Sequence, residues 1–153
     1  MDLMEPALTE ERHDEHDDHD AALCLVDAWM GSLSAADWYG LLDLYAPGGT
    51  VTFLGKERHG WTQLRRSALR QADRLRGARF EQVGRIHVDG DHVRFQTTVV
   101  TPMGRSRLAH TWRLAGRLGE GRIVHHQVDV LHHDAVPEAH AEHAPADVAV
   151  PFF

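Results

Sequence analysis

Two histidines lie on the apolar faces of neighbouring predicted strands. His110 stands between Leu108 and Trp112 in an alternating pattern, and His126 precedes Val128 in the next one. Alternation places both imidazoles on one face of the sheet, where cross-strand contact is possible. An imidazole titrates near neutral pH, so it can move a proton or donate a hydrogen bond to a developing enolate. Taken alone, the pattern is also typical of hydrogen-bonded core histidines, and both interpretations remain open.

A metal site or bound cofactor is not expected at this pair. Zinc takes at least three protein ligands, and no third ligand is evident beside the two imidazoles. The neighbouring His125, His132 and His133 fall on the opposite strand face or at the rim. The histidines of the acidic N-terminal segment are interpreted as solvated.

Composition limits the class of protein. With 153 residues and a net charge of −7 concentrated near the N-terminus, the chain predicts one domain and no nucleic-acid partner, because it has no basic stripe to follow phosphates. Cys24 is the single cysteine, which excludes an internal disulfide and fits a reducing cytoplasm. No run of about 18 apolar residues is present. We therefore expect no membrane span, no signal peptide and a cytoplasmic location.

The folded domain is predicted to span residues 21–136. Residues 1–20 are acidic and histidine-rich, and residues 137–153 are rich in alanine, histidine and proline. Neither end has an apolar period, so both are predicted to be disordered tails.

The first half of the domain is predicted to contain three helices and one short strand. Apolar residues recur at helical spacing in three segments, and a Pro-Gly-Gly stop ends the second. The helices are expected at 22–33, 38–45 and 61–75, and the strand at 50–54.

After Gly77 the apolar period changes from helical to alternating. Turn signals at 89–91, 102–104 and 118–121 separate the strands of an antiparallel meander. Helices that precede a sheet predict an α+β fold, with the three helices packed on one face of the sheet.

Two segments resemble the NTF2-like superfamily. They are Leu-Leu-Asp-Leu-Tyr-Ala-Pro-Gly-Gly-Thr-Val at 41–51 and Arg-His-Gly-Trp-x-x-Leu at 58–64. By length and element order the chain is most similar to the SnoaL-like polyketide cyclases and ketosteroid isomerases, over roughly residues 21–131. The resemblance implies a cone-shaped pocket between a curved antiparallel sheet and the helices. It also implies a homodimer through the outer face of the sheet.

The resemblance assigns positions within that pocket. Trp29 falls where the isomerases have an oxyanion-hole tyrosine, Phe53 where they have a proton-shuttling aspartate, and His110 where they have a protonated aspartate. In the cyclases, a histidine at the position of His110 works with an acid that would fall near Val128. Because two carboxylates are replaced here, isomerisation by the family's steroid mechanism is not expected.

The predicted site therefore combines a histidine pair with an apolar wall. His110 and His126 are the predicted catalytic residues. Four aromatic side chains on pocket-facing positions indicate a large, flat or polyene-like hydrophobic substrate. The predicted substrate-binding residues are Trp29, Phe53, Phe95, Thr97, Trp112 and Val128.

Asp129 is the only acidic residue on the last predicted strand. Alternation places it on the outer face, near Arg107 and Arg113. A bulge would be needed to turn it inward, and nothing in the sequence requires one.

These residues favour a cyclase or isomerase that acts on a hydrophobic polyketide-like intermediate of specialised metabolism. Either His110, helped by His126, moves a proton beside a carbonyl, or the pocket holds a polyene in a reactive shape while His110 polarises a carbonyl. A [4+2] ring closure would need no base, and the sequence does not choose between the two. One alternative is an epoxide-opening enzyme, which would need a pair of inward acids. Another is a non-catalytic dimeric ligand-binding module.

Overall fold

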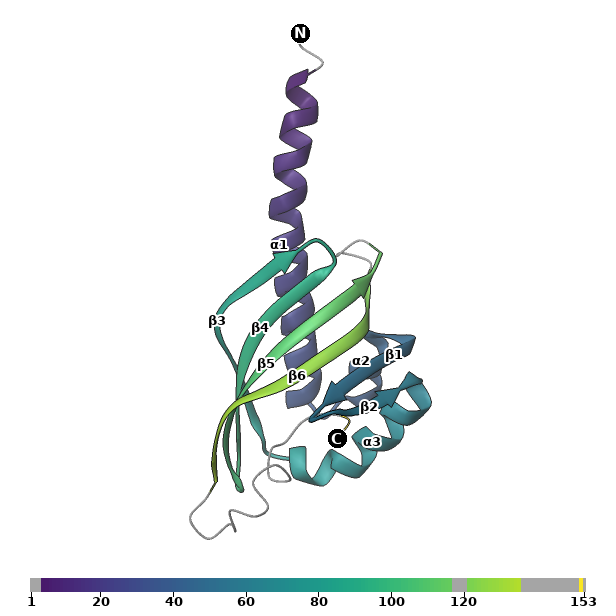
Figure 1. Ribbon diagram of the computed structural model, residues 1–153, viewed down its shortest axis with the longest axis vertical. Coiled ribbons are helices and arrows are strands. Elements are labelled where there is room, and N and C mark those ends of the chain that lie inside the picture. The colour runs from purple at the N-terminus through teal and green to yellow at the C-terminus, as the bar shows by residue number, and fades with distance from the viewer. Residues whose placement is uncertain (1–3, 117–120, 136–151, 153) are drawn as a thin grey trace.

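The fold is a curved sheet with one long helix and two shorter helices against it (Figure 1). The computed structural model describes residues 4–116, 121–135 and 152. In chain order the elements are α1 (Met4–Ser34), α2 (Trp38–Asp43), β1 (Tyr45–Phe53), β2 (Lys56–His59), α3 (Gly60–Leu75), β3 (Arg79–Asp89), β4 (His92–Thr101), β5 (Gly104–Ala115) and β6 (Arg122–Ala135).

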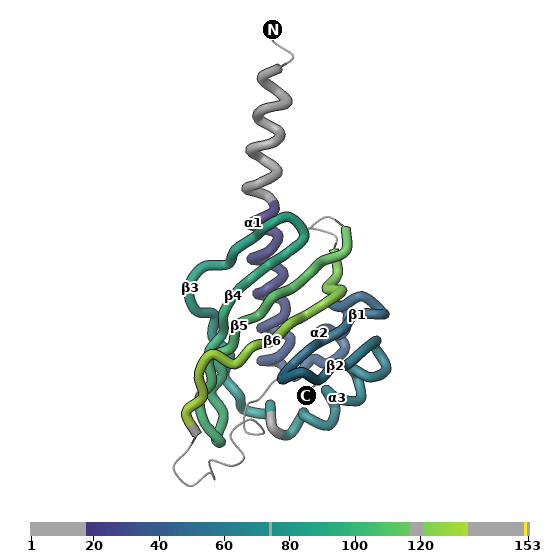
Figure 2. The backbone as a smooth tube through the Cα atoms, in the orientation of Figure 1, coloured from purple at the N-terminus to yellow at the C-terminus, as the bar shows by residue number. Residues whose placement is uncertain are grey.

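The six strands form one mixed sheet in the order β2-β1-β6-β5-β4-β3. The predicted α+β class is confirmed, but the sheet is not wholly antiparallel, because β1 pairs with β6 in parallel. The reason is topological: β1 is separated from the meander by α3 and joins the sheet beside its last strand. Figure 2 shows β6 between β5 and β1, with α1 crossing the long strands and α3 beside β1 and β2.

Two bulges shape β6. The pairing with β5 shifts between Arg113 and Leu114 and again between Arg107 and Leu108. At the first shift Ile123, and not Val124, becomes the fully buried residue. Strict alternation with His126 and Val128 predicts Val124, and not Ile123, on the inner face, and this prediction is wrong. A bulge adds an unpaired residue and bends the strand, which supports the curvature of the sheet.

Asp129 lies between these bulges and remains on the outer face. Its carboxylate is exposed and accepts a hydrogen bond from Gln127 at 3.2 Å. The outer face also carries the exposed side chains of Arg94, Arg107 and Arg113. A homodimer through this face stays a prediction.

Element boundaries differ from the prediction around Tyr45. The second helix ends at Asp43, capped at its start by Asp37, whose carboxylate accepts from the backbone of Gly40 at 3.0 Å. Tyr45 therefore begins β1 instead of closing the helix. The strand β2 was not predicted, because its four polar residues carry no apolar alternation.

The two predicted tails differ in what the structure describes. Helix α1 starts at Met4, well before the start near Ala21 that the apolar period predicts. Once packed turns have nucleated a helix, each further turn costs little, so an apolar stripe is not needed for it to extend. No helix in the described ranges is long and apolar enough to cross a membrane. Of the C-terminal segment only Phe152 is described, and its side chain is buried.

Gly49 lies in the segment between Tyr45 and Thr50 over which the β1–β6 register shifts, and its position is crowded. A Cβ there would lie 2.9 Å from the carbonyl oxygen of Ile123 and 3.0 Å from that of Ala46, both backbone atoms. We expect Gly49→Ala to lower the free energy of unfolding by about 1–3 kcal/mol, measured by urea denaturation. Gly48→Ala is the matched control, because a Cβ at Gly48 meets open space. Equal stability of the two variants would show that the close approach of Gly49 to the backbone of Ile123 and Ala46 does not require glycine.

Candidate functional site

Five buried side chains form one continuous run of hydrogen bonds through the core. Trp29 Nε1 donates to the hydroxyl of Tyr45 at 3.0 Å, and that hydroxyl lies 2.8 Å from His126 Nδ1. His126 Nε2 lies 2.8 Å from His110 Nδ1, and His110 Nε2 lies 2.8 Å from Thr97 Oγ1. We call these five residues the buried network.

The network joins elements that are far apart in the sequence. Its members come from α1, β1, β6, β5 and β4 in turn. In the β5–β6 register His126 is opposite Trp112 and His110 is opposite Val128, so the two imidazoles meet diagonally. The predicted meeting of His110 and His126 across neighbouring strands is therefore what the structure shows, while their catalytic role stays a prediction.

Aromatic rings enclose the histidine pair. Phe95 stacks on His110 with ring centroids 4.6 Å apart, and Trp29 meets the same imidazole edge-on at 5.1 Å. Trp112 stands at 90° to His126, with centroids 5.8 Å apart. Such packing adds about 0.5–1.5 kcal/mol per aromatic pair beyond the burial of area.

The predicted substrate-binding residues are together, but as packed core. None of the six is more than 5% exposed, and both histidines are 1% exposed. Phe53 on β1 lies opposite Val128 on β6 in the strand register, so it belongs to the same packed group. The open cone implied by the resemblance is thus filled at its centre in this structure, because large aromatic rings and two imidazoles occupy it.

The donors and acceptors of the network can be assigned from one end. An indole nitrogen only donates, so the oxygen of Tyr45 accepts from Trp29. Among the described residues, His126 Nδ1 is the acceptor within reach of the buried tyrosine proton, and we assign that hydrogen bond as Tyr45 O–H to His126 Nδ1. His126 then carries its proton on Nε2 and donates to His110 Nδ1. His110 in turn carries its proton on Nε2 and donates to Thr97. With this assignment both imidazoles are Nε2–H tautomers, and all four hydrogen bonds run in one direction.

Burial keeps the network neutral. Burial lowers the pKa of His110 to about 3. The pKa of His126 is also lowered, first by burial and then by repulsion from His110 and His125. Burial raises the pKa of Tyr45 above its usual range. At pH 7 both imidazoles and the phenol are therefore uncharged, and both histidines are poor bases.

Sequence reasoning missed two polar groups of this core. Tyr45 was predicted as helical core, although a buried tyrosine hydroxyl usually needs a partner, which was the available signal. The second group is the indole nitrogen of Trp112, which is buried and has no hydrogen-bond partner in the part of the chain that the structure describes. Leaving a buried donor unpaired costs about 1–3 kcal/mol.

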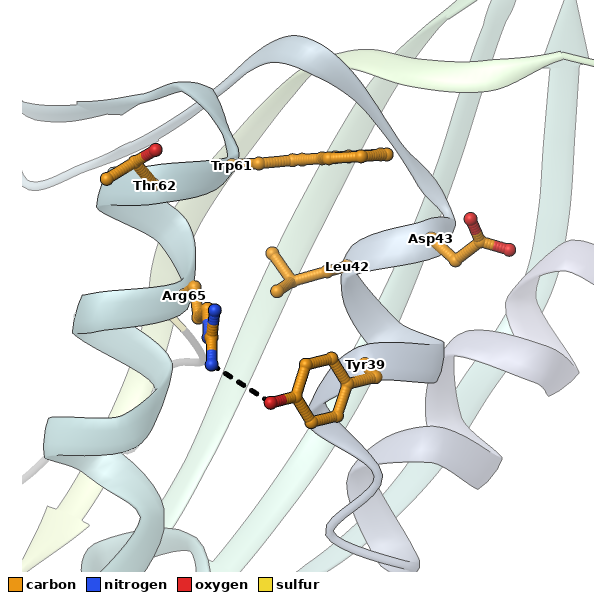
Figure 3. A pocket seen from close by; sticks show the side chains of 6 residues that line it. All are labelled: Tyr39, Leu42, Asp43, Trp61, Thr62 and Arg65. Carbon is orange, nitrogen blue, oxygen red and sulfur yellow. Dashed lines mark hydrogen bonds between the residues drawn. The ribbon is translucent and has the colours of Figure 1, made fainter.

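A cleft of about 470 Å³ lies between α2 and α3 (Figure 3). In it Arg65 donates to the hydroxyl of Tyr39 at 2.9 Å, and Trp61 and Leu42 form the apolar side. Trp61 Nε1 donates to the backbone oxygen of Tyr45 at 2.9 Å. The cleft thus touches the backbone, but no side chain, of the buried network.

Acidic and metal-ligating groups are not concentrated in the described interior. Its buried polar side chains are serine, threonine and histidine, without a carboxylate. Among the described residues, no three His, Cys, Asp or Glu side chains lie close enough to hold a metal ion.

Comparison with known proteins assigns the family. The model of the SnoaL-like domain matches residues 26–126, more than half of the chain. The chain belongs to the SnoaL-like family. This NTF2-like family includes cyclases and isomerases. No curated protein matched the chain.

Solved structures with this fold share little sequence with the SnoaL-like chain. A candidate polyketide cyclase from Sinorhizobium meliloti is 20% identical, with a TM-score of 0.54, and the match covers 69% of this chain and 93% of that one. A candidate ketosteroid isomerase from Kribbella flavida is 15% identical, with a TM-score of 0.56 and coverage of 82% and 88%. A SnoaL-like protein of unknown function from Burkholderia thailandensis is 16% identical, with a TM-score of 0.60 and coverage of 74% and 97%. At these identities the matches establish the fold alone.

The lowered histidine pKa values make stability depend on pH. Below the unfolded pKa of about 6.5, the unfolded chain binds protons that the buried His110 and His126 do not take up. Stability should therefore fall as pH drops from 6.5 to 4.5, by up to about 1.4 kcal/mol per pH unit for each histidine.

Urea denaturation across that pH range tests this dependence. We expect His110→Gln to have a shallower slope of unfolding free energy against pH than the wild type. His87→Gln is the control, because His87 is exposed on β3, and its slope should match the wild type. Parallel slopes for His110→Gln and the wild type would show that His110 titrates normally in the folded state.

Proposed function

We propose that this SnoaL-like protein is a cyclase for a hydrophobic, polyketide-like intermediate, in which neutral donors polarise a carbonyl and the aromatic wall shapes the chain. The observation that carries the proposal is the position of the unpaired indole N–H of Trp112, which is buried in an apolar, aromatic core beside the paired imidazoles of His110 and His126. A preorganised donor in a water-excluded site stabilises developing negative charge on a carbonyl oxygen far better than a donor in water does.

The unpaired indole nitrogen of Trp112 lies two residues from His110 on the same face of β5, beside His126. A carbonyl oxygen that entered the core would accept from this donor and remove the cost of leaving it unpaired. We therefore propose Trp112 as the carbonyl-binding residue; His110 becomes a second donor only if its Nε2–H turns from Thr97 to the carbonyl.

The same geometry disfavours proton abstraction by the histidines. Every imidazole nitrogen of the pair already has a hydrogen-bond partner. A base with a pKa near 3 has little driving force to take a proton from carbon. Passing a proton along the network would leave a buried phenolate at Tyr45, which its raised pKa opposes. Ring closure driven by shape and polarisation fits these constraints, and near-attack positioning alone can supply about 7–11 kcal/mol.

Access to the core requires the aromatic wall to separate, because the histidines are closed to solvent. A substrate that separates these aromatic side chains breaks contacts between their rings. If the substrate has rings or conjugated double bonds, its own contacts with the aromatic side chains would replace the broken ones. The epoxide-opening alternative lacks its acid pair in the described interior.

The proposal can be tested with an enone whose infrared carbonyl stretch reports hydrogen bonding to its carbonyl oxygen. With trans-4-phenyl-3-buten-2-one as the probe, we expect the infrared carbonyl stretch of the bound form to lie below that of the probe in hexane. Trp112→Phe should lose most of this shift and weaken binding by about 2–10-fold, because a neutral hydrogen bond contributes about 0.5–1.5 kcal/mol. Tyr39→Phe, on the exposed face of α2, is the control and should match the wild type.

Two other outcomes would each overturn the proposal. A bound probe with an unshifted carbonyl band would indicate a non-catalytic binding module. Exchange of the probe's α-methyl protons into D₂O, faster than in buffer and lost in His110→Gln, would indicate that the histidine pair is a base after all.

A further inference from the structure

The cleft between α2 and α3 is not used by the proposed function, because no side chain of the buried network lines it (Figure 3). Its volume of about 470 Å³ lies within the range of about 300–1,000 Å³ that is typical of small-molecule sites. The described lining combines apolar and aromatic side chains with a hydroxyl, a carboxylate and a guanidinium group. Its members are Tyr39, Leu42, Asp43, Trp61, Thr62 and Arg65.

Two aromatic rings of the lining are held in position by polar contacts. Trp61 Nε1 donates to the backbone oxygen of Tyr45 at 2.9 Å. Tyr39 is 70% exposed, and its hydroxyl accepts a hydrogen bond from Arg65 at 2.9 Å. Figure 3 shows the two rings on either side of the Leu42 side chain. Because the rings are already fixed, a flat apolar ligand could bind them at a small cost in side-chain ordering.

The charge of Arg65 is not balanced by a carboxylate in the part of the chain that the structure describes. Its hydrogen bond goes to the neutral hydroxyl of Tyr39, whose ring centre lies 5.3 Å from the guanidinium carbon. A guanidinium group has several N–H donors, so Arg65 can keep this contact and still donate to a ligand. Hydrogen bonds from a guanidinium group to a carboxylate are stronger than those to a neutral oxygen.

The other charged group of the lining already has a partner. The carboxylate of Asp43 pairs with Arg122 at 3.4 Å, and the guanidinium carbon of Arg122 also lies 5.6 Å from the ring centre of Trp61. Figure 3 shows Asp43 and Arg65 at opposite ends of the cleft. The charge available to a ligand is therefore positive and lies at the α3 end.

We propose that this cleft is a second ligand site, which binds a flat aromatic carboxylate with its ring against Trp61 and Tyr39 and its carboxylate on Arg65. Such a ligand matches both the fixed rings and the unbalanced guanidinium group. Binding there does not require the aromatic wall around the histidine pair to separate. The site is thus independent of the function proposed for the core.

Titration of the wild-type protein with 2-naphthoate, followed by ¹H–¹⁵N NMR of the indole N–H groups, tests where the ligand binds. We expect the Trp61 signal to shift, because its ring is a wall of the cleft, while the signals of Trp29 and Trp112 stay in place. Shifts at Trp29 or Trp112 without one at Trp61 would locate the ligand in the core and overturn the inference.

The role of the guanidinium group is tested with Arg65→Gln. This variant should bind 2-naphthoate about fivefold more weakly, and the neutral 2-naphthamide within about twofold of the wild type. Arg66→Gln is the matched control, because it removes the same charge from an exposed position on α3 outside the described lining. Equal losses of naphthoate affinity in the two variants, or equal losses for the acid and the amide in Arg65→Gln, would rule out a carboxylate on Arg65.

The role of the rings is tested with Tyr39→Leu, which keeps an apolar side chain at an exposed position and removes the flat ring. It should weaken the binding of both naphthalene ligands by about 2–10-fold. Leu69→Ala, at an exposed position of α3 outside the described lining, is the control. Unchanged affinities in Tyr39→Leu would contradict the proposed ring position.

A last variant separates this site from the core. Trp112→Phe should leave 2-naphthoate binding unchanged, so the cleft and the carbonyl-polarising function can each fail without the other. A loss of naphthoate affinity in Trp112→Phe as large as that in Arg65→Gln would mean that the two are one site, which contradicts the inference.

Discussion

Burying two imidazoles and a phenol beside one another is possible only if each of their polar atoms is paired. The indole nitrogen of Trp29 meets this constraint at one end, because it can only donate and so makes the oxygen of Tyr45 an acceptor. At the other end the hydroxyl oxygen of Thr97 accepts the last hydrogen bond in the assigned direction. A network that is fully paired is stabilising and rigid, whereas one missing partner leaves an uncompensated buried group. The neutrality of the core and its closed aromatic packing both depend on this arrangement.

The fold forms the network by bringing together one side chain from each of five helices and strands. The parallel pairing of β1 with β6 places Tyr45 beside His126, and the diagonal register of β5 and β6 places His110 next to it. The helix α1 contributes Trp29 from the opposite side. The described interior has no buried carboxylate, although the family resemblance predicts acids there, and the carbonyl-polarising function proposed above would not require one.

Much of the fold and of the candidate site was predictable from the sequence, and the remaining features depend on contacts between segments that are distant in the sequence. The alternation around His110 and His126 was enough to place both imidazoles on one face of the sheet, and the apolar spacing was enough to place α3. Tyr45 was assigned to a helix because its apolar spacing continues that of α2, while its true place is decided by pairing with β6. The bulge that turns Ile123 inward in place of Val124 is likewise a property of two strands together. The aromatic residues were correctly grouped, but composition does not reveal whether such a group encloses a cavity or fills it.

The most direct test of the central claim is the protonation of the two imidazoles, measured by ¹⁵N NMR of histidine-labelled protein at pH 7 and at pH 5. The account predicts that His110 and His126 both remain neutral Nε2–H tautomers, with unprotonated Nδ1 atoms and unchanged shifts at the two pH values. An imidazolium signal from either residue at pH 5, or an Nδ1–H tautomer at pH 7, would contradict the direction and the neutrality of the network.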